Sequence, residues 1–178
     1  MGLQLLRDGL LEGLDLVDAG APPSVVARCT ALGATVHQLD PTVGDEALAE
    51  SVAALPGAGA LVAAAGLDPD PAEGLARLWE ATRAVVAGRL IPAGAGRVLL
   101  IGPAPGAAGA AELRAALDNL VRTTAVEWSR HGICVVALLP GDETDDEVLA
   151  ELVAFLLSPA GAYVSGTSIE LDGLSLSR

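Results

Sequence analysis

The chain has 178 residues, of which 52 % are hydrophobic, and this size predicts one globular domain over residues 1–178. Its formal net charge is −13 and its ten basic residues are all arginines without a cluster, so neither nucleic acid nor a membrane surface is an expected partner. The sequence has no apolar run long enough to span a membrane and no signal-peptide pattern at its start, so we expect a cytoplasmic protein. Its two cysteines do not have the spacing of metal ligands, so we expect no metal.

Short apolar runs alternate with helical patterns along the chain, which is typical of a parallel α/β sheet. The predicted strands cover residues 14–17, 34–39, 60–64, 98–101, 133–138 and 167–171. The first is the weakest, because Asp15 and Asp18 are unusual in a strand buried on both faces. The predicted helices cover residues 45–55, 71–87, 110–130 and 143–157.

The helix predicted over residues 110–130 has an unusually wide apolar face. A helix that rests on a sheet needs one apolar stripe about 100° wide, so the extra width predicts a second apolar neighbour. The alternative is that alanines on an exposed face reflect helix propensity alone. We expect a subunit interface formed by Ala111, Leu113, Ala115, Leu117, Leu120, Val121, Thr124 and Trp128.

Several segments, in the same order along the chain, resemble the short-chain dehydrogenase/reductase family, and within it the 3-oxoacyl-ACP reductases. The similar segments are residues 61–66, 96–103, 114–128, 131–141 and 155–173. They resemble the strand that ends in Asn-Asn-Ala-Gly, the strand that ends at the catalytic Ser, the Tyr-x-x-x-Lys helix, the next strand with its Pro-Gly turn, and the closing segment. The resemblance implies a Rossmann-like, doubly wound parallel sheet, reduced to about six strands, with one βα unit and the substrate lid absent.

The resemblance also implies where the catalytic side chains would stand. The Ser position falls on Gly102 or Pro103, the Tyr position on Ala110 and the Lys position on Arg114, while the family's two Asn become Ala63 and Ala64. The chain contains no Lys, one Tyr (Tyr163) and one Asn (Asn119). An arginine keeps its charge but cannot shuttle a proton, so we expect no catalytic residues and no dehydrogenase activity of the chain alone.

The family's glycine-rich phosphate loop is also shortened. The corresponding stretch is residues 19–26, in which Gly20 remains and two prolines remove amide donors. An anion site near Ser24 is one interpretation of this remnant, and a proline-initiated helix with nothing bound is the other. We expect the second, and therefore no cofactor.

Two further groups of residues have structural interpretations. His131 follows a helix, whose C-terminus favours a partial positive charge, and the acidic run 142–147 is at a helix start, where capping is expected rather than a cation site. Cys29 and Cys134 are predicted to be small core residues.

The resemblance extends to a functional expectation. The family includes degenerate members that pair with an active homologue, so we expect a non-catalytic subunit or scaffold that forms a homo-oligomer, or a hetero-oligomer with an active member. The alternative is a reduced NAD(P)-dependent oxidoreductase, or a protein that binds a nucleotide or acyl-CoA.

Overall fold

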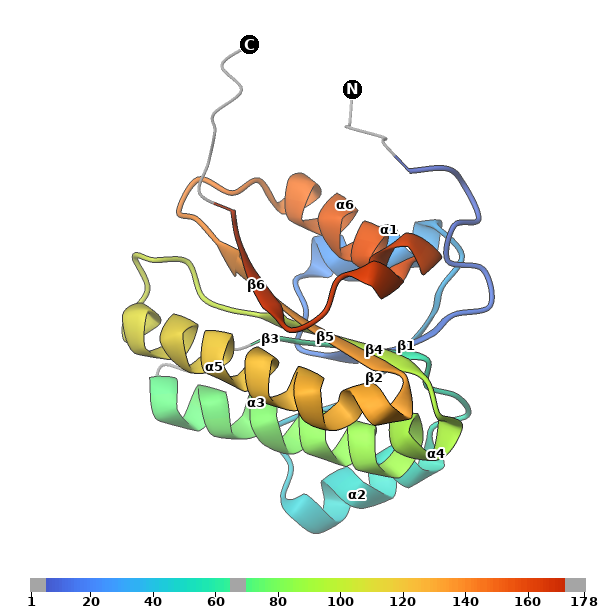
Figure 1. The fold of residues 1–178 in the computed structure, drawn as a ribbon. Coiled ribbons are helices and arrows are strands. Elements are labelled where there is room, and N and C mark those ends of the chain that lie inside the picture. Colours follow the sequence, from blue (N-terminus) through green and yellow to red (C-terminus); the bar gives the residue numbers. More distant parts are fainter. Residues whose placement is uncertain (1–5, 65–69, 172–178) are drawn as a thin grey trace.

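The computed structural model describes residues 6–64 and 70–171 of the chain. They form a six-stranded, entirely parallel sheet with helices on both faces (Figure 1). The strand order is β2-β1-β3-β4-β5-β6, so the direction of winding reverses between β1 and β3. The predicted Rossmann-like, doubly wound sheet is confirmed.

The strands are β1 (Asp15–Ala19), β2 (Thr35–Gln38), β3 (Ala60–Ala64), β4 (Gly96–Ile101), β5 (Ile133–Pro140) and β6 (Thr167–Leu171). Their register aligns apolar residues across the sheet: Val17 pairs with Leu61, Leu61 with Val98, and Val98 with Val135. All four side chains are fully buried. Such rows of branched aliphatic residues explain why these segments form strands covered on both faces.

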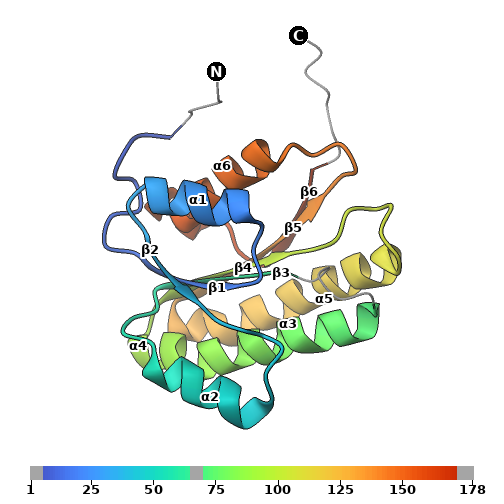
Figure 2. The same ribbon diagram turned by 180° about the vertical axis from the view of Figure 1, so that it is seen from behind.

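Two helical layers cover the sheet (Figures 1 and 2). On one face lie α1 (Pro23–Ala31) and α6 (Asp146–Leu157), and on the other lie α2 (Asp45–Ala54), α3 (Pro71–Val85) and α5 (Ala110–Trp128). Each layer encloses its own buried apolar cluster against the sheet. In the described part of the chain, no helix is long and apolar enough to cross a membrane.

Short helical segments refine several predicted boundaries. Helix α3 passes into a π-helical turn (Val86–Leu90) and a short α4 (Ile91–Ala93), and Gly94 ends this run with a φ of +67°. Helix α5 passes into a 3-10 turn, Ser129–His131. A second 3-10 turn, η3 (Pro159–Tyr163), links α6 to β6.

Two predicted elements differ from the structure for identifiable reasons. Helix α6 begins at Asp146 rather than at residue 143, because the Asp145 side chain caps it by accepting a hydrogen bond from the amide of Glu147 at 2.7 Å. The weak strand predicted over residues 14–17 extends to Ala19 and includes both aspartates. Asp15 is tolerated because its carboxylate is half-exposed and bonds to Nε2 of His37 at 2.7 Å.

The sheet has the six strands expected from the sequence. Strand β2 leads through a single helix, α2, to β3, which leaves β2 at the edge of the sheet. Strand β5 leads through α6 and η3 to β6, the other edge. The connections are therefore short at both edges.

Candidate functional site

In an open parallel sheet, ligands bind beyond the carboxyl ends of the strands, at the point where the winding reverses. Here that point lies between β1 and β3. The turn after β1 contains Gly20, whose φ of +87° favours glycine, and α1 begins three residues later at Pro23. The predicted loop remnant therefore does lie at the expected ligand edge of the sheet.

A buried carboxylate lies at this turn. Asp18, at the end of β1, is 3 % exposed. Its Oδ1 accepts a hydrogen bond from the amide of Ala21 at 2.7 Å, and its Oδ2 accepts one from Nε2 of Gln38 at 2.8 Å. A phosphate at this turn would face the negative charge and compete for the Ala21 amide. The sequence analysis noted Asp18 only as an unusual residue for a strand buried on both faces. That unusual position was itself an indication that the Asp18 carboxylate has specific hydrogen-bond partners.

The start of α1 offers few amides to an anion. Pro22 and Pro23 have none, and the amides of Val25 and Val26 donate to the carbonyl oxygen of Pro22 at 3.0 and 3.3 Å. The hydroxyl of Ser24 is buried and has no hydrogen-bond partner among the described residues. Ser24 thus has an unpartnered but buried hydroxyl at the place where one of the two sequence interpretations put an anion site.

An acid at the end of β2 escaped the sequence analysis. Asp40 lies two residues beyond β2, and its Oδ1 accepts hydrogen bonds from Oγ1 and the amide of Thr42 at 2.6 and 2.8 Å. These bonds, that of the Thr42 hydroxyl first, lower the pKa of the Asp40 carboxyl below its usual value. Dinucleotide-binding folds carry a ribose-binding acid about 20 residues after the glycine turn, and the distance from Gly20 would have revealed Asp40.

Two of the three positions that the resemblance assigns to catalytic side chains are in the core. Gly102 follows β4 and is buried, and a Cβ atom there would lie 2.7 Å from Cδ2 of Leu139 and 3.1 Å from Cδ1 of Leu117. Ala110, the first residue of α5, is 3 % exposed. A side chain at Gly102 would require Leu139 to shift, and a larger side chain at Ala110 would begin from a buried position.

The third position, Arg114, connects the ends of two strands. Its Nη1 donates to the carbonyl oxygens of Pro103, just after β4, and Pro140, the last residue of β5, at 3.1 and 2.7 Å. Nearby, Oδ1 of Asp142 accepts a hydrogen bond from the amide of Gly106 at 2.8 Å. These bonds hold the segments after β4 and β5 together at the carboxyl edge.

The single tyrosine lies at the amino ends of the strands, opposite the carboxyl ends. Tyr163 ends η3, just before β6 begins, and its side chain is 93 % exposed. The preceding Ala162 accepts a hydrogen bond from Sγ of Cys134, the second residue of β5, at 3.5 Å. This contact with the second residue of β5 places the turn at the amino ends of the strands. The single asparagine, Asn119, is exposed midway along α5.

The residues predicted to form a subunit interface fall into two groups. The inner group packs into the core of the chain itself and faces the sheet: Leu113, Leu117, Val121 and Thr124. In the outer group, Ala111 and Ala115 are exposed, and Leu120 and Trp128 are half-buried against the same core. The inner group is therefore not available to another subunit, because the sheet already covers it. An interface on α5 stays a prediction, and the outer group would carry it.

A pair of aromatic rings joins α5 to α3. The rings of Trp79 and Trp128 are stacked, with centroids 6.3 Å apart and an interplanar angle of 3°. Both side chains are half-buried. The stack fixes the two helices beside one another on one face of the sheet.

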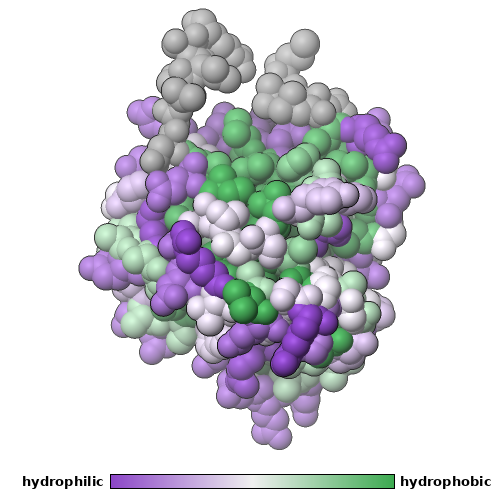
Figure 3. Space-filling view, viewed as in Figure 1, coloured by the Kyte–Doolittle hydropathy of each residue, from purple (hydrophilic) through white to green (hydrophobic). Residues whose placement is uncertain are grey.

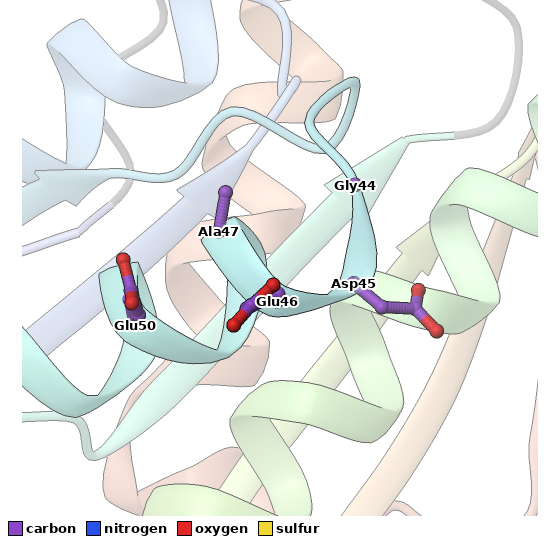
Figure 4. Close-up of a pocket in the computed structure, with 5 residues that line it drawn as sticks. All are labelled: Gly44, Asp45, Glu46, Ala47 and Glu50. Atoms are coloured by element: carbon purple, nitrogen blue, oxygen red, sulfur yellow. The ribbon is translucent and has the colours of Figure 1, made fainter.

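A hollow of about 540 Å³ lies at the start of α2 and is strongly acidic. Figure 4 shows that the carboxylates of Asp45, Glu46 and Glu50 point in different directions rather than toward a common centre. Within residues 6–64 and 70–171, no group of three or more His, Cys, Asp or Glu side chains is placed to hold a metal ion. The hollow does not present a converging set of ligands.

A second hollow, of about 460 Å³, lies between α5 and β6. Asp118 lines it and accepts hydrogen bonds from Nε of Arg122 at 3.0 Å and from the hydroxyl of Ser168 at 2.5 Å. These bonds, that of Arg122 first, lower the pKa of the Asp118 carboxyl. Within this hollow, Asp118 is thus bonded to Arg122, while Arg114 bonds to backbone carbonyl oxygens.

Cys29 is buried, as predicted, whereas Cys134 is only half-buried because it lies near the start of β5, before the pairing with β6 begins at Val136. Burial raises the pKa of the Cys29 thiol from 9.0 to about 12, with Arg28 opposing and Asp18 adding to this shift. Neither cysteine is placed as an activated nucleophile in a catalytic pair.

Comparison with known proteins supports the fold. No family model matches the chain, and no curated protein matches it. The solved structure of a protein named citronellol catabolism dehydrogenase (AtuB), from Pseudomonas aeruginosa PAO1, aligns with a TM-score of 0.74 at 23 % sequence identity. The alignment covers 93 % of this chain and 96 % of that chain. The similarity shows that the chain has a Rossmann-like α/β fold.

Proposed function

We propose that this chain is a non-catalytic subunit with a dehydrogenase fold, which associates with itself or with an active homologue. The observation that carries the proposal is the position of Tyr163. A general acid must lie within hydrogen-bond reach of its substrate, but the chain's one tyrosine is exposed at the amino edge of the sheet. Ligands of this fold bind at the other edge.

Arg114 supports the same proposal. By resemblance it stands where the family has its catalytic Lys, and it is bonded to the carbonyl oxygens of Pro103 and Pro140. A guanidinium in this arrangement stabilises the ends of two strands and has no proton to exchange at neutral pH. Its role in this chain is therefore structural.

The outer face of α5 supports association. Ala111 and Ala115 are exposed one helical turn apart, so another helix could approach closely along this line. Val126, further along the helix, is 78 % exposed. Small side chains that permit close approach, followed by an exposed apolar residue, suit a helix–helix contact between subunits.

Asp40 favours a second candidate function, the binding of a nucleotide without catalysis. Its carboxylate follows β2, where dinucleotide-binding folds have a ribose-binding acid, and the hydroxyl of Ser24 at the start of α1 has no hydrogen-bond partner among the described residues. Against this, Asp18 places a buried negative charge at the turn that would hold the phosphates. We therefore rank nucleotide binding second.

Titration calorimetry with NADH, NADPH, NAD and NADP separates the two candidates. The proposal expects no binding at millimolar cofactor. A micromolar dissociation constant that Asp40→Asn abolishes and Asp45→Asn leaves unchanged would establish the second candidate instead, because Asp45 is an exposed acid away from the turn.

Association is tested separately, by light scattering and by affinity purification from the native host. The proposal expects either a stable oligomer of this chain or recovery of a dehydrogenase homologue in a fixed ratio. A chain that remains monomeric at high concentration and recovers no homologue would contradict the proposal.

A further inference from the structure

Helix α6 is apolar on the side that faces away from the sheet. After its first turn it contains a single charged residue, Glu151, which is 7 % exposed and paired with Arg28 of α1. The outward positions carry Val148, Leu152 and Phe155, whose spacing of four and three residues places them on one face. We call these three residues the α6 ridge. A helix without a polar face is normally covered on all sides.

The ridge is accessible in this chain. Val148 is 46 % exposed and Phe155 is 40 % exposed, while Leu152 is half-buried. Among the described residues, the large apolar side chains that are exposed are Val126, Val148, Phe155 and Tyr163, and the last three belong to α6 and the turn that follows it. Figure 3 shows apolar surface gathered in its upper part, where α6 lies in Figure 1.

The segment that contains the ridge is negatively charged, and Arg28 of the neighbouring α1 is already paired with Glu151. Residues 133–171 include seven acidic residues and no Lys, Arg or His. Five of the acids are exposed around the start of α6: Asp142, Glu143, Asp145, Asp146 and Glu147. The surface therefore combines an apolar line with a dense acidic block at one end, and no basic residue of the same segment neutralises it.

We propose that the α6 ridge and the acidic block form a docking surface for a cationic amphipathic helix of a partner protein. Such a helix would place apolar side chains at spacings of three and four residues on the ridge, and Lys or Arg against the acids. A second copy of this chain fits poorly, because it would bring its own net charge of −13 and the same acidic block. An anionic membrane surface would be repelled for the same reason.

This surface is independent of the association proposed for α5. Helices α6 and α5 lie on opposite faces of the sheet (Figures 1 and 2). A partner on α6 could therefore bind whether or not another subunit covers α5. If the subunit contact on α5 is absent, the docking surface on α6 can still be tested, and the reverse also holds.

The probe is a synthetic helical peptide with leucines on one face and arginines on the other. A control peptide has glutamates in place of the arginines. Binding of each is followed by fluorescence anisotropy at several salt concentrations. We expect the cationic peptide to bind and the anionic peptide not to bind. Phe155→Ser and Val148→Ser together should weaken binding at least about tenfold, as the loss of central apolar anchors does.

Two matched controls separate docking from general attraction to an acidic protein. Val126→Ser removes an apolar residue of α5 that is more exposed than either ridge residue, and it should leave the affinity unchanged. Glu143→Gln with Glu147→Gln should weaken binding more than Glu46→Gln with Glu50→Gln, although both pairs change the net charge equally. Circular dichroism checks that every variant remains folded.

Several outcomes would overturn the proposal. Equal weakening by the α6 and α5 variants, or by both glutamine pairs, would mean attraction without a site. A dimer in light scattering that Phe155→Ser dissociates would assign the ridge to self-association. Binding to vesicles of anionic lipid that Phe155→Ser abolishes would assign it to a membrane.

Discussion

Nε of Arg28 on α1 lies 2.6 Å from Oε1 of Glu151 on α6, and the two side chains are only 18 % and 8 % exposed. This ion pair joins the two helices that cover one face of the sheet. Removal of one partner leaves an unpaired charge between α1 and α6, where the side chains are largely shielded from water. The pair therefore specifies how the helices meet more than it adds to stability.

We expect Glu151→Met alone to lower the free energy of unfolding by about 3–5 kcal/mol, whereas Arg28→Met with Glu151→Met should approach the stability of the natural chain. Urea denaturation of the single and double variants measures this. Arg122→Met, which breaks an exposed pair with Asp118, is the control and should cost at most about 1 kcal/mol. A double variant as unstable as the single one would contradict the expected coupling.

Restoring the family's side chains should not create a dehydrogenase. Gly102→Ser places a Cβ 2.7 Å from Cδ2 of Leu139, so this change should cost about 1–3 kcal/mol of stability through overpacking. The triple variant with Ala110→Tyr and Arg114→Lys should show no oxidation or reduction of a nicotinamide cofactor. Turnover by this variant, measured by absorbance with a range of alcohols and ketones, would show that a working cleft survives.

Ala115→Glu should dissociate any oligomer that α5 forms while the chain stays folded. Ala115 is exposed on the outer face of α5, so a glutamate there disturbs a close contact without entering the core. Ala49→Glu on the exposed side of α2 is the matched control. Light scattering measures the mass of each variant, and an oligomer that survives Ala115→Glu uses another surface.

The stability of the chain should fall between about pH 9 and pH 12. Burial raises the pKa of Cys29 from 9.0 to about 12, so above pH 9 the thiol loses its proton more readily in the unfolded chain. The stability that this thiol contributes is complete below pH 9 and is lost as the pH rises to 12, with an upper limit of about 4 kcal/mol.

The absence of Lys makes this window simple to interpret, since few other side chains titrate there. Denaturation at pH 8, 10 and 11 should show the loss in the natural chain and in Cys134→Ala. Cys29→Ala should flatten the profile. An equally steep decline in Cys29→Ala would assign the effect to another group.

Several properties of this protein follow from the sequence by itself. Alternating apolar runs and helical patterns predict the parallel sheet, because strand and helix periodicity are local properties. The missing Lys leaves the family's Tyr-x-x-x-Lys pair incomplete whatever the fold, because a side chain that is not encoded cannot be placed. The caps and turns were predicted less accurately, as Asp145 at the start of α6 shows, because neighbouring acids compete for one capping position.

Only the tertiary structure decided which side chains meet across the chain. The sequence pattern grouped Leu117 with Ala115 on α5, and the position of the sheet separated them into a buried and an exposed residue. The partners of Asp18 and Arg114 depend on which strands lie side by side, and strand order is not a local property. The exposure of the α6 ridge likewise follows from the layers around it, since an apolar helix becomes a surface only where the fold leaves one side uncovered.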